Sequence, residues 1–136
     1  MVTRADGLPC ACGRRGCFES YASISALSRY AGGRPARAVI DGVLAGNPED
    51  MEAFDKYLYE LAVGVTSILS LFRPEIIAIG GGVSAAGGAL TEGLTRAVEE
   101  LLSGRPGVYD VNIKLAAHKN DAGMIGAAAL AKLHLT

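Results

Sequence analysis

Three cysteines crowded into eight residues constrain this chain more than any other feature of its sequence. Cys10, Cys12 and Cys17 are the only cysteines present, and two glycines lie between the second and the third. An odd number of neighbouring thiols is poorly suited to a disulfide framework, and the lack of a C-x-x-C motif before a helix argues against a redox motif. A loop with glycines can instead curl until its thiolates converge on zinc, which takes four tetrahedral ligands. The spacing therefore predicts a zinc-binding loop over residues 10–17, with three free buried cysteines as the alternative.

Composition and charge are those of an ordinary globular domain. The chain has 136 residues, half of them hydrophobic and a fifth charged, with a formal net charge of −1. That charge gives no reason to expect nucleic acid or an anionic membrane as a partner. No apolar run is long enough to span a bilayer, and no secretory signal is recognisable. We therefore expect a cytoplasmic protein with a single domain over residues 1–136.

Hydrophobic periodicity predicts a chain rich in helices. Apolar residues recur at helical spacing over residues 18–31, and a short helix is expected over residues 36–45. Asn47 can cap a longer helix, because Pro48 and two acidic residues follow it and suit a helix N-terminus. This helix must end before Pro74, whose ring disfavours helical geometry at the preceding residue.

Two short strands are expected among the later helices. Residues 75–79 form a compact β-branched run, and residues 108–116 alternate apolar with polar side chains. Helical spacing lies between them over residues 89–102, and Asp121 can cap a final apolar helix that extends to about Leu133. A right-handed crossover makes the two strands parallel or near neighbours in one sheet. Two strands are a thin sheet for this length, which suggests that other strands belong to a missing segment.

A run of three glycines follows the first strand. Gly80, Gly81 and Gly82 stand between that strand and a helix, at the sheet edge where ligands of α/β proteins gather. A phosphate or a nucleotide can approach such a backbone closely. The run is neither a Walker loop nor a complete G-x-G-x-x-G fingerprint. On these residues alone a tight packing turn is an equal alternative, and Ser84 is expected to cap the helix that follows.

Three motifs of this sequence resemble those of the ROK family and occur in the family's order. The family comprises bacterial repressors and sugar kinases such as glucokinase and N-acetylmannosamine kinase. They are the cysteine motif over residues 8–23, the glycine motif over residues 73–84 and the closing helix over residues 121–128. The resemblance implies an α/β fold: the C-terminal lobe of an actin/hexokinase-like (ribonuclease H-like) ATPase, rich in helices and with a small sheet. Family members commonly dimerise through this lobe, so a homodimer is expected.

The resemblance also completes the expected zinc site. In the family, three cysteines and an upstream histidine hold a structural zinc, so the three cysteines named above are its expected ligands here. The family's histidine would fall immediately before Met1, which leaves the fourth ligand missing from the chain. Water, His118 or His134 could take that place, but the spacing favours neither histidine.

Glu19 and the glycine turn are the expected ligand-binding residues. Taken alone, Glu19 is an acid in the first turn of a helix, where the helix dipole favours a negative charge. In the family, a glutamate at this place accepts hydrogen bonds from sugar hydroxyls, and the zinc loop would hold it in position. The segment around Gly80, Gly81 and Gly82 resembles the part of the family that lines the adenosine side of the ATP cleft.

Residues that phosphoryl transfer requires are missing from this sequence. ROK kinases bind the phosphates and Mg²⁺ of ATP through an N-terminal Asp-x-Gly-Gly-Thr loop, and an aspartate acts as the base. No such loop occurs here, and Asp110 and Asp121 lie outside the context of that base. The chain is therefore expected to be the C-terminal fragment of an ATP-dependent hexose kinase, inactive alone because the N-terminal ATP-phosphate-binding lobe is absent. The alternatives are a fragment of a sugar-responsive repressor and a free-standing zinc-bound module for scaffolding or dimerisation.

Overall fold

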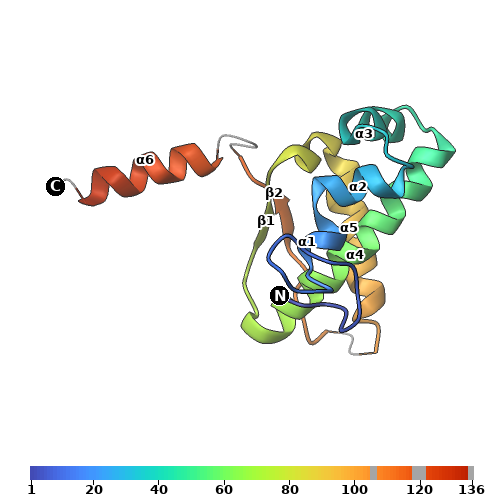
Figure 1. Cartoon of the computed structure of the whole chain (residues 1–136). Coiled ribbons are helices and arrows are strands. Elements are labelled where there is room, and N and C mark those ends of the chain that lie inside the picture. The colour runs from blue at the N-terminus through green and yellow to red at the C-terminus, as the bar shows by residue number, and fades with distance from the viewer. Residues whose placement is uncertain (105–106, 118–121, 135–136) are drawn as a thin grey trace.

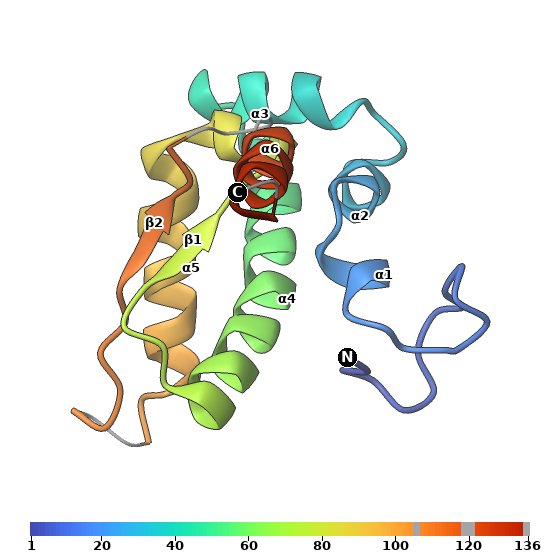
Figure 2. The same ribbon diagram turned by 90° about the vertical axis from the view of Figure 1, so that its left-hand side faces the viewer.

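Helix α4 (Pro48–Phe72) is the element against which most of the chain packs (Figures 1 and 2). The computed structural model describes residues 1–104, 107–117 and 122–134. The other elements are α1 (Glu19–Ala22), α2 (Ile24–Tyr30), α3 (Ala36–Leu44), β1 (Ile77–Ile79), the 3₁₀ helix η1 (Gly82–Ala86), α5 (Gly88–Leu101), β2 (Ile113–Leu115) and α6 (Ala122–His134). Helices α1, α2, α3 and α5 all contact α4, so this helix organises the fold.

Both ends of α4 lie where the capping and proline residues of the sequence predict them. The Asn47 side chain accepts hydrogen bonds from two backbone N–H groups of the first turn, at 3.0 and 3.1 Å, and Pro48 is the first helical residue. The helix ends where Arg73 adopts a left-handed conformation with φ of 44°, directly before Pro74. Both predicted ends of this helix are therefore confirmed.

The prediction of one helix over residues 18–31 is wrong, because the chain breaks at Ser23. This residue has an extended backbone, with φ of −84° and ψ of 166°, which ends α1 after a single turn. Its side-chain oxygen accepts a hydrogen bond from the N–H of Ala26 at 3.3 Å, so Ser23 caps α2. A serine hydroxyl competes with the helix backbone for hydrogen bonds, which explains why a new helix starts here.

Strands β1 and β2 form a parallel pair, as the sequence predicts, with Ile77 opposite Ile113. Both are shorter than the runs predicted over residues 75–79 and 108–116, and most of the missing residues lie at the starts of the runs. In the parallel register, residues 108–110 would lie opposite residues 72–74, where α4 ends and Pro74 follows, so this part of the longer run has no strand partner. Figures 1 and 2 show α4 and α5 on one face of this sheet. The middle residue of each strand is exposed on the opposite face.

One continuous apolar core lies between α4 and the elements around it. Its largest fully buried side chains are Leu27, Ile40, Leu90, Leu94, Val39 and Val98. Half-buried apolar side chains of both strands pack against the same cluster, so the small sheet covers one side of it. Each fully buried aliphatic side chain stabilises the fold by about 1.5–3 kcal/mol.

Helix α6 projects away from the body of the structure (Figure 1). Its side chains from Gly123 to Lys132 are exposed, and apolar Met124 and Leu130 are 69% and 59% exposed. The prediction of a closing apolar helix is confirmed, while its predicted cap, Asp121, lies outside the described residues. Among the described residues, no helix combines the length and the apolar character needed to cross a membrane.

An ion pair between a buried carboxylate and a partly exposed guanidinium fixes the start of α4 beside α3. The Asp50 carboxylate is almost fully buried and pairs with the guanidinium of Arg34. A β-carbon added at Gly42 of α3 would lie 2.0 Å from a carboxylate oxygen of Asp50. The absence of a side chain at Gly42 therefore lets α3 approach the carboxylate closely.

The N-terminal loop packs against α4 at Gly64. A β-carbon added there would lie 2.3 Å from a ring carbon of Phe18, the residue after Cys17. We expect Gly64→Ala to lower the free energy of unfolding by about 1–3 kcal/mol, because overpacking forces the ring or the helix to move. Gly126→Ala is the matched control, since its β-carbon meets nothing within 4 Å and alanine favours a helix by about 1 kcal/mol. Urea denaturation measures both variants, and equal effects would contradict this contact.

Candidate metal and ligand site

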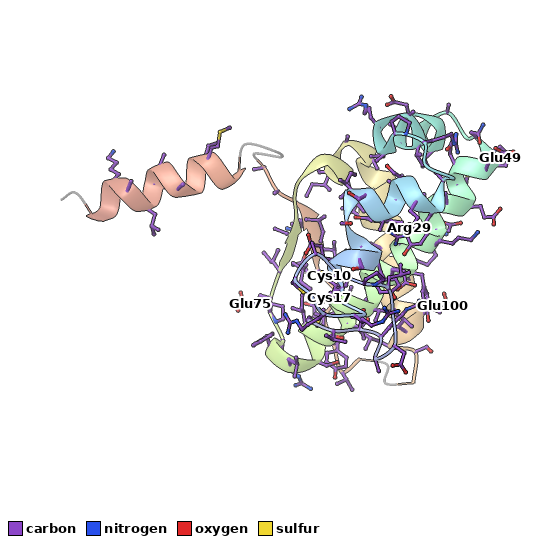
Figure 3. The ribbon with its side chains drawn as sticks, viewed as in Figure 1. Cys10, Cys17, Arg29, Glu49, Glu75 and Glu100 are labelled. Atoms are coloured by element: carbon purple, nitrogen blue, oxygen red, sulfur yellow. The ribbon has the colours of Figure 1, made fainter. Side chains whose placement is uncertain are left out.

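The N-terminal loop brings the three cysteines together, as the sequence predicts. Figure 3 labels two of them, Cys10 and Cys17, beside α1. The three sulfurs all lie within 4.8 Å of one another, and those of Cys12 and Cys17 are 3.5 Å apart. Tetrahedral zinc, with Zn–S distances of about 2.3 Å, holds sulfurs about 3.8 Å apart, so the three thiols fit three corners of such a site. Cys12 is exposed, Cys10 is half-buried and Cys17 is only 5% exposed. His118 and the side chain of His134, both considered for the fourth corner, lie outside the described residues.

Glycine is required where this loop crosses the first residues of the chain. Gly16 has φ of 69°, and its carbonyl accepts hydrogen bonds from the N–H groups of Thr3 and Arg4, at 2.8 and 3.2 Å. A β-carbon at Gly16 would lie 1.5 Å from the carbonyl oxygen of Arg4. Any other residue at this position would therefore displace the loop.

Side chains of two helices hold the loop on the body of the structure. The Tyr21 hydroxyl of α1 accepts a hydrogen bond from the N–H of Leu8 at 2.6 Å. The Arg4 guanidinium lies 4.7 Å from the centre of the Tyr21 ring, and it also pairs with Glu60 of α4. These contacts fix the position of the thiols relative to α1 and α4.

Hydrogen bonds distribute charge unevenly among the thiols. The backbone N–H of Arg14, followed by its guanidinium, hydrogen-bonds to the Cys12 sulfur and lowers the pKa of this thiol to about 6. The sulfurs of Cys17 and Cys12 are in hydrogen-bond contact, and this contact together with burial raises the pKa of Cys17 to about 11. The two shifts are opposite in direction, so the Cys12 thiol loses its proton more readily than the Cys17 thiol.

Glu19 is the first residue of α1 and is exposed, which confirms the helix-start position that the sequence predicts. It lines a surface cavity of about 380 Å³ together with Cys10, Arg29 and three serines. Arg29, labelled in Figure 3, donates a hydrogen bond to the backbone carbonyl of Ser20 at the rim of this cavity. A carboxylate acceptor beside hydroxyl groups and a guanidinium donor suits a ligand rich in hydroxyls.

The glycine turn lines a second cavity, of about 360 Å³. Gly80 follows β1, Gly81 has φ of 83°, and η1 begins at Gly82. Gly81 and Gly82 line the cavity, whereas Gly80 is not among its lining residues. The prediction of Ser84 as a helix cap is wrong, because its hydroxyl donates to the carbonyl of Gly81 at 2.7 Å and so braces the turn.

The start of α2 separates these two cavities. Ser23 and Ser25 line the cavity of Glu19, whereas Ile24 lines the glycine cavity together with Arg37 of α3. The sequence does not predict Ile24 or Arg37 at this place, because a continuous helix over residues 18–31 would turn Ile24 toward the core. The break at Ser23 instead leaves Ile24 41% exposed.

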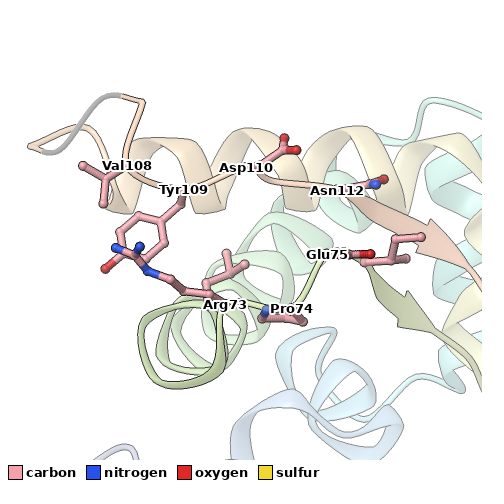
Figure 4. Close-up of a pocket in the computed structure, with 9 residues that line it drawn as sticks. Arg73, Pro74, Glu75, Val108, Tyr109, Asp110 and Asn112 are labelled. Carbon is pink, nitrogen blue, oxygen red and sulfur yellow. The ribbon is translucent and has the colours of Figure 1, made fainter.

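A third cavity, of about 500 Å³, lies before the two strands rather than after them (Figure 4). Its walls come from the end of α4 and from the segments that lead into β1 and β2. The Arg73 guanidinium lies 5.4 Å from the centre of the Tyr109 ring, and Glu75 and Asp110 add two exposed acids. No sequence pattern marks this cavity, because its two walls are separated by more than thirty residues.

Comparison with known proteins decides the family. A family model described as the ROK family matches residues 1–134. The chain belongs to the ROK family. It is 32% identical to a glucokinase of Thermotoga maritima, with 97% of this chain and 47% of that protein covered. It is 33% identical to an N-acetylmannosamine kinase of Citrobacter koseri, with 96% of this chain and 45% of that protein covered.

The fold of this ROK chain also matches a solved structure. A ROK family glucokinase from Streptomyces griseus, crystallised in complex with glucose and AMPPNP, superposes with a TM-score of 0.90 at 27% identity. The match covers 96% of this chain and 49% of the glucokinase. The predicted fold class is therefore confirmed: an actin/hexokinase-like fold, rich in helices and with a small sheet, while the assignment to the C-terminal lobe stays a prediction. The chain spans about half the length of the relatives that it matches.

We expect Gly16→Ala to expose Cys17, because the new β-carbon would overlap the Arg4 carbonyl and force the loop to move. Gly13→Ala is the matched control: Gly13 also has a positive φ, of 84°, but a β-carbon there meets nothing within 4 Å. The control change should cost about 1–2 kcal/mol of backbone strain and leave Cys17 shielded. The rate at which a thiol reagent labels Cys17 in the native chain measures this difference. Equal labelling rates in the two variants would contradict the packing described for Gly16.

Proposed function

We propose that this chain is the C-terminal half of an ATP-dependent sugar kinase, and that it contributes binding surfaces for both a hexose and ATP. The observation that carries the proposal is the pair of cavities on either side of the start of α2, one lined by Glu19 and the other by the glycine turn. The relatives named above are kinases, and the superposed Streptomyces griseus enzyme was crystallised with glucose and AMPPNP. The repressor alternative has no comparable support.

Glu19 is the sugar-binding residue in this proposal. Its carboxylate is exposed at the start of α1 and can accept hydrogen bonds from two neighbouring hydroxyls, a pattern that fits one edge of a hexose. Cys17 lies two residues before it, so the position of the carboxylate depends on the cysteine loop. The serines and Arg29 that share the cavity can donate further hydrogen bonds to the oxygens of the sugar.

Cys10, Cys12 and Cys17 would hold a structural zinc ion in the same proposal. Their sulfurs are close enough to share one metal, and the loop that carries them is already fixed by hydrogen bonds. The chemistry that zinc supplies here is structural: it locks the loop and thereby the start of α1. The family's upstream histidine, which lies outside the chain, is the proposed fourth ligand.

The glycine turn is the proposed nucleotide-binding segment. Gly81 and Gly82 leave the backbone bare, while Ile24 and Arg37 on the facing wall offer an apolar surface and a guanidinium to a purine base. The phosphate loop, the Mg²⁺ ligands and the base that accepts the hydroxyl proton belong to the other half of the kinase. A homodimer and a cytoplasmic location, where ATP is available, complete the proposal.

Gly82→Val tests the nucleotide cavity. A β-carbon at Gly82 lies an ordinary 3.7 Å from the Ile24 side chain, so valine should preserve the fold and fill the cavity. We expect AMPPNP to shift the amide NMR signals of Gly81 and Gly82 in the parent chain. Its affinity should fall about tenfold or more in Gly82→Val, which corresponds to about 1.4 kcal/mol. Gly126→Val on the projecting helix is the control; signal shifts confined to the Arg73 cavity would contradict the proposal.

Glu19→Gln tests the sugar site. The chain is mixed with the separately expressed N-terminal half of the Thermotoga maritima glucokinase, and glucose-dependent formation of ADP is followed. We expect Glu19→Gln to lower kcat/KM for glucose by about 100-fold, because hydrogen bonds to a charged group contribute about 1.5–3 kcal/mol each. Glu52→Gln is the control, since Glu52 is an exposed acid of α4 that pairs with Lys56. Equal activity of the two variants would contradict the assignment, and NMR titration of the chain with glucose checks it independently of assembly.

A further inference from the structure

The geometry of the cysteine loop favours oxidation of two of its thiols to a disulfide, a reaction that plays no part in the proposed kinase function. Cys12 is exposed to solvent, and its sulfur lies 3.5 Å from the sulfur of the buried Cys17. A disulfide bond has a length of about 2.05 Å, so the two sulfurs need to approach by only about 1.5 Å. Gly13 follows Cys12 with φ of 84°, and no atom lies within 4 Å of where its β-carbon would be, so this turn has space to move. We propose that Cys12 and Cys17 form a reversible disulfide when the metal-free loop meets a peroxide.

The structure favours this pair over the two pairs that include Cys10. Cys10 and Cys12 are separated by one residue, and a disulfide between them would close a small, strained ring. The backbone of Cys10 is also held in place, because its N–H donates to the carbonyl of Arg14 at 2.8 Å. The sulfurs of Cys12 and Cys17, by contrast, are already in direct contact.

The reaction proceeds in two balanced steps. Peroxide reaches the exposed Cys12 first, and the thiol becomes a sulfenic acid while the O–O bond breaks and one water leaves. The Cys17 sulfur then attacks the Cys12 sulfur, the S–O bond breaks, and the proton of the Cys17 thiol leaves with the hydroxyl as a second water. In total, two thiols lose two electrons and two protons to one peroxide. A dithiol reductant reverses the bond by exchange.

The disulfide and the metal exclude each other. Bonding of Cys12 to Cys17 removes two of the three thiols that converge in this loop and leaves Cys10 alone. Zinc on the three sulfurs would in turn protect them from peroxide. This inference depends on the positions of the sulfurs and not on the sugar-kinase proposal, so the two can fail separately.

Peptide mapping of the full chain tests the inference. The chelator-treated chain is exposed to hydrogen peroxide, remaining thiols are blocked, and the protein is cut with trypsin. Cleavage after Arg14 and Arg15 separates Cys12 from Cys17, so a bond between them appears as two linked peptides. We expect this link in the parent chain and in Cys10→Ser, its loss in Cys12→Ser and Cys17→Ser, and its reversal by dithiothreitol. The link should also form about tenfold or more faster in the native chain than in urea, where the sulfurs meet only transiently.

Other outcomes would overturn the inference. A link that persists in Cys12→Ser and is lost in Cys10→Ser, a link between two chains, or irreversible oxidation of Cys12 alone would each show that Cys17 does not react with Cys12. An equal rate of linkage in urea would show that the fold does not bring the two sulfurs together. Protection of the link-forming thiols by added zinc, measured by the same peptide map, is the expected result for a shared site.

Discussion

Phe18 rests against Gly64 of α4 so closely that a β-carbon would not fit between them, and one turn away Glu60 pairs with Arg4. These two contacts dock the N-terminal loop on the longest helix of the structure. Cys17 directly precedes Phe18 and the proposed sugar ligand directly follows it. The same packing therefore positions the thiol cluster and the carboxylate. A change in either contact displaces both of these groups.

The break at Ser23 determines how the two candidate cavities are arranged. Because α1 ends after one turn and α2 begins in a new direction, the start of α2 presents serines to one cavity and Ile24 to the other. A hydroxyl-rich ligand and a nucleotide would then lie on the two sides of one helix start. Phosphoryl transfer needs such proximity, since positioning of the two reactants supplies much of its rate enhancement.

Local chemistry in the sequence predicts most of the elements, and tertiary packing decides the features that it misses. Asn47 and Pro74 mark the ends of α4, because capping and ring sterics act within a few residues. Helical periodicity cannot reveal the break at Ser23, since serine is tolerated both inside a helix and at its cap. Ile24 and Arg37 meet only when α2, α3 and η1 pack together, so no local pattern marks the cavity that they line.

Zinc coordination is the direct test of whether a metal held by the cysteine loop positions Glu19. The measurement is X-ray absorption at the zinc edge, made on the chain purified under reducing conditions and quantified for metal by mass spectrometry. We expect one zinc per chain, bound to the three clustered sulfurs at about 2.3 Å and lost in Cys17→Ser. A folded chain without zinc, or a zinc bound through fewer sulfurs, would contradict this expectation.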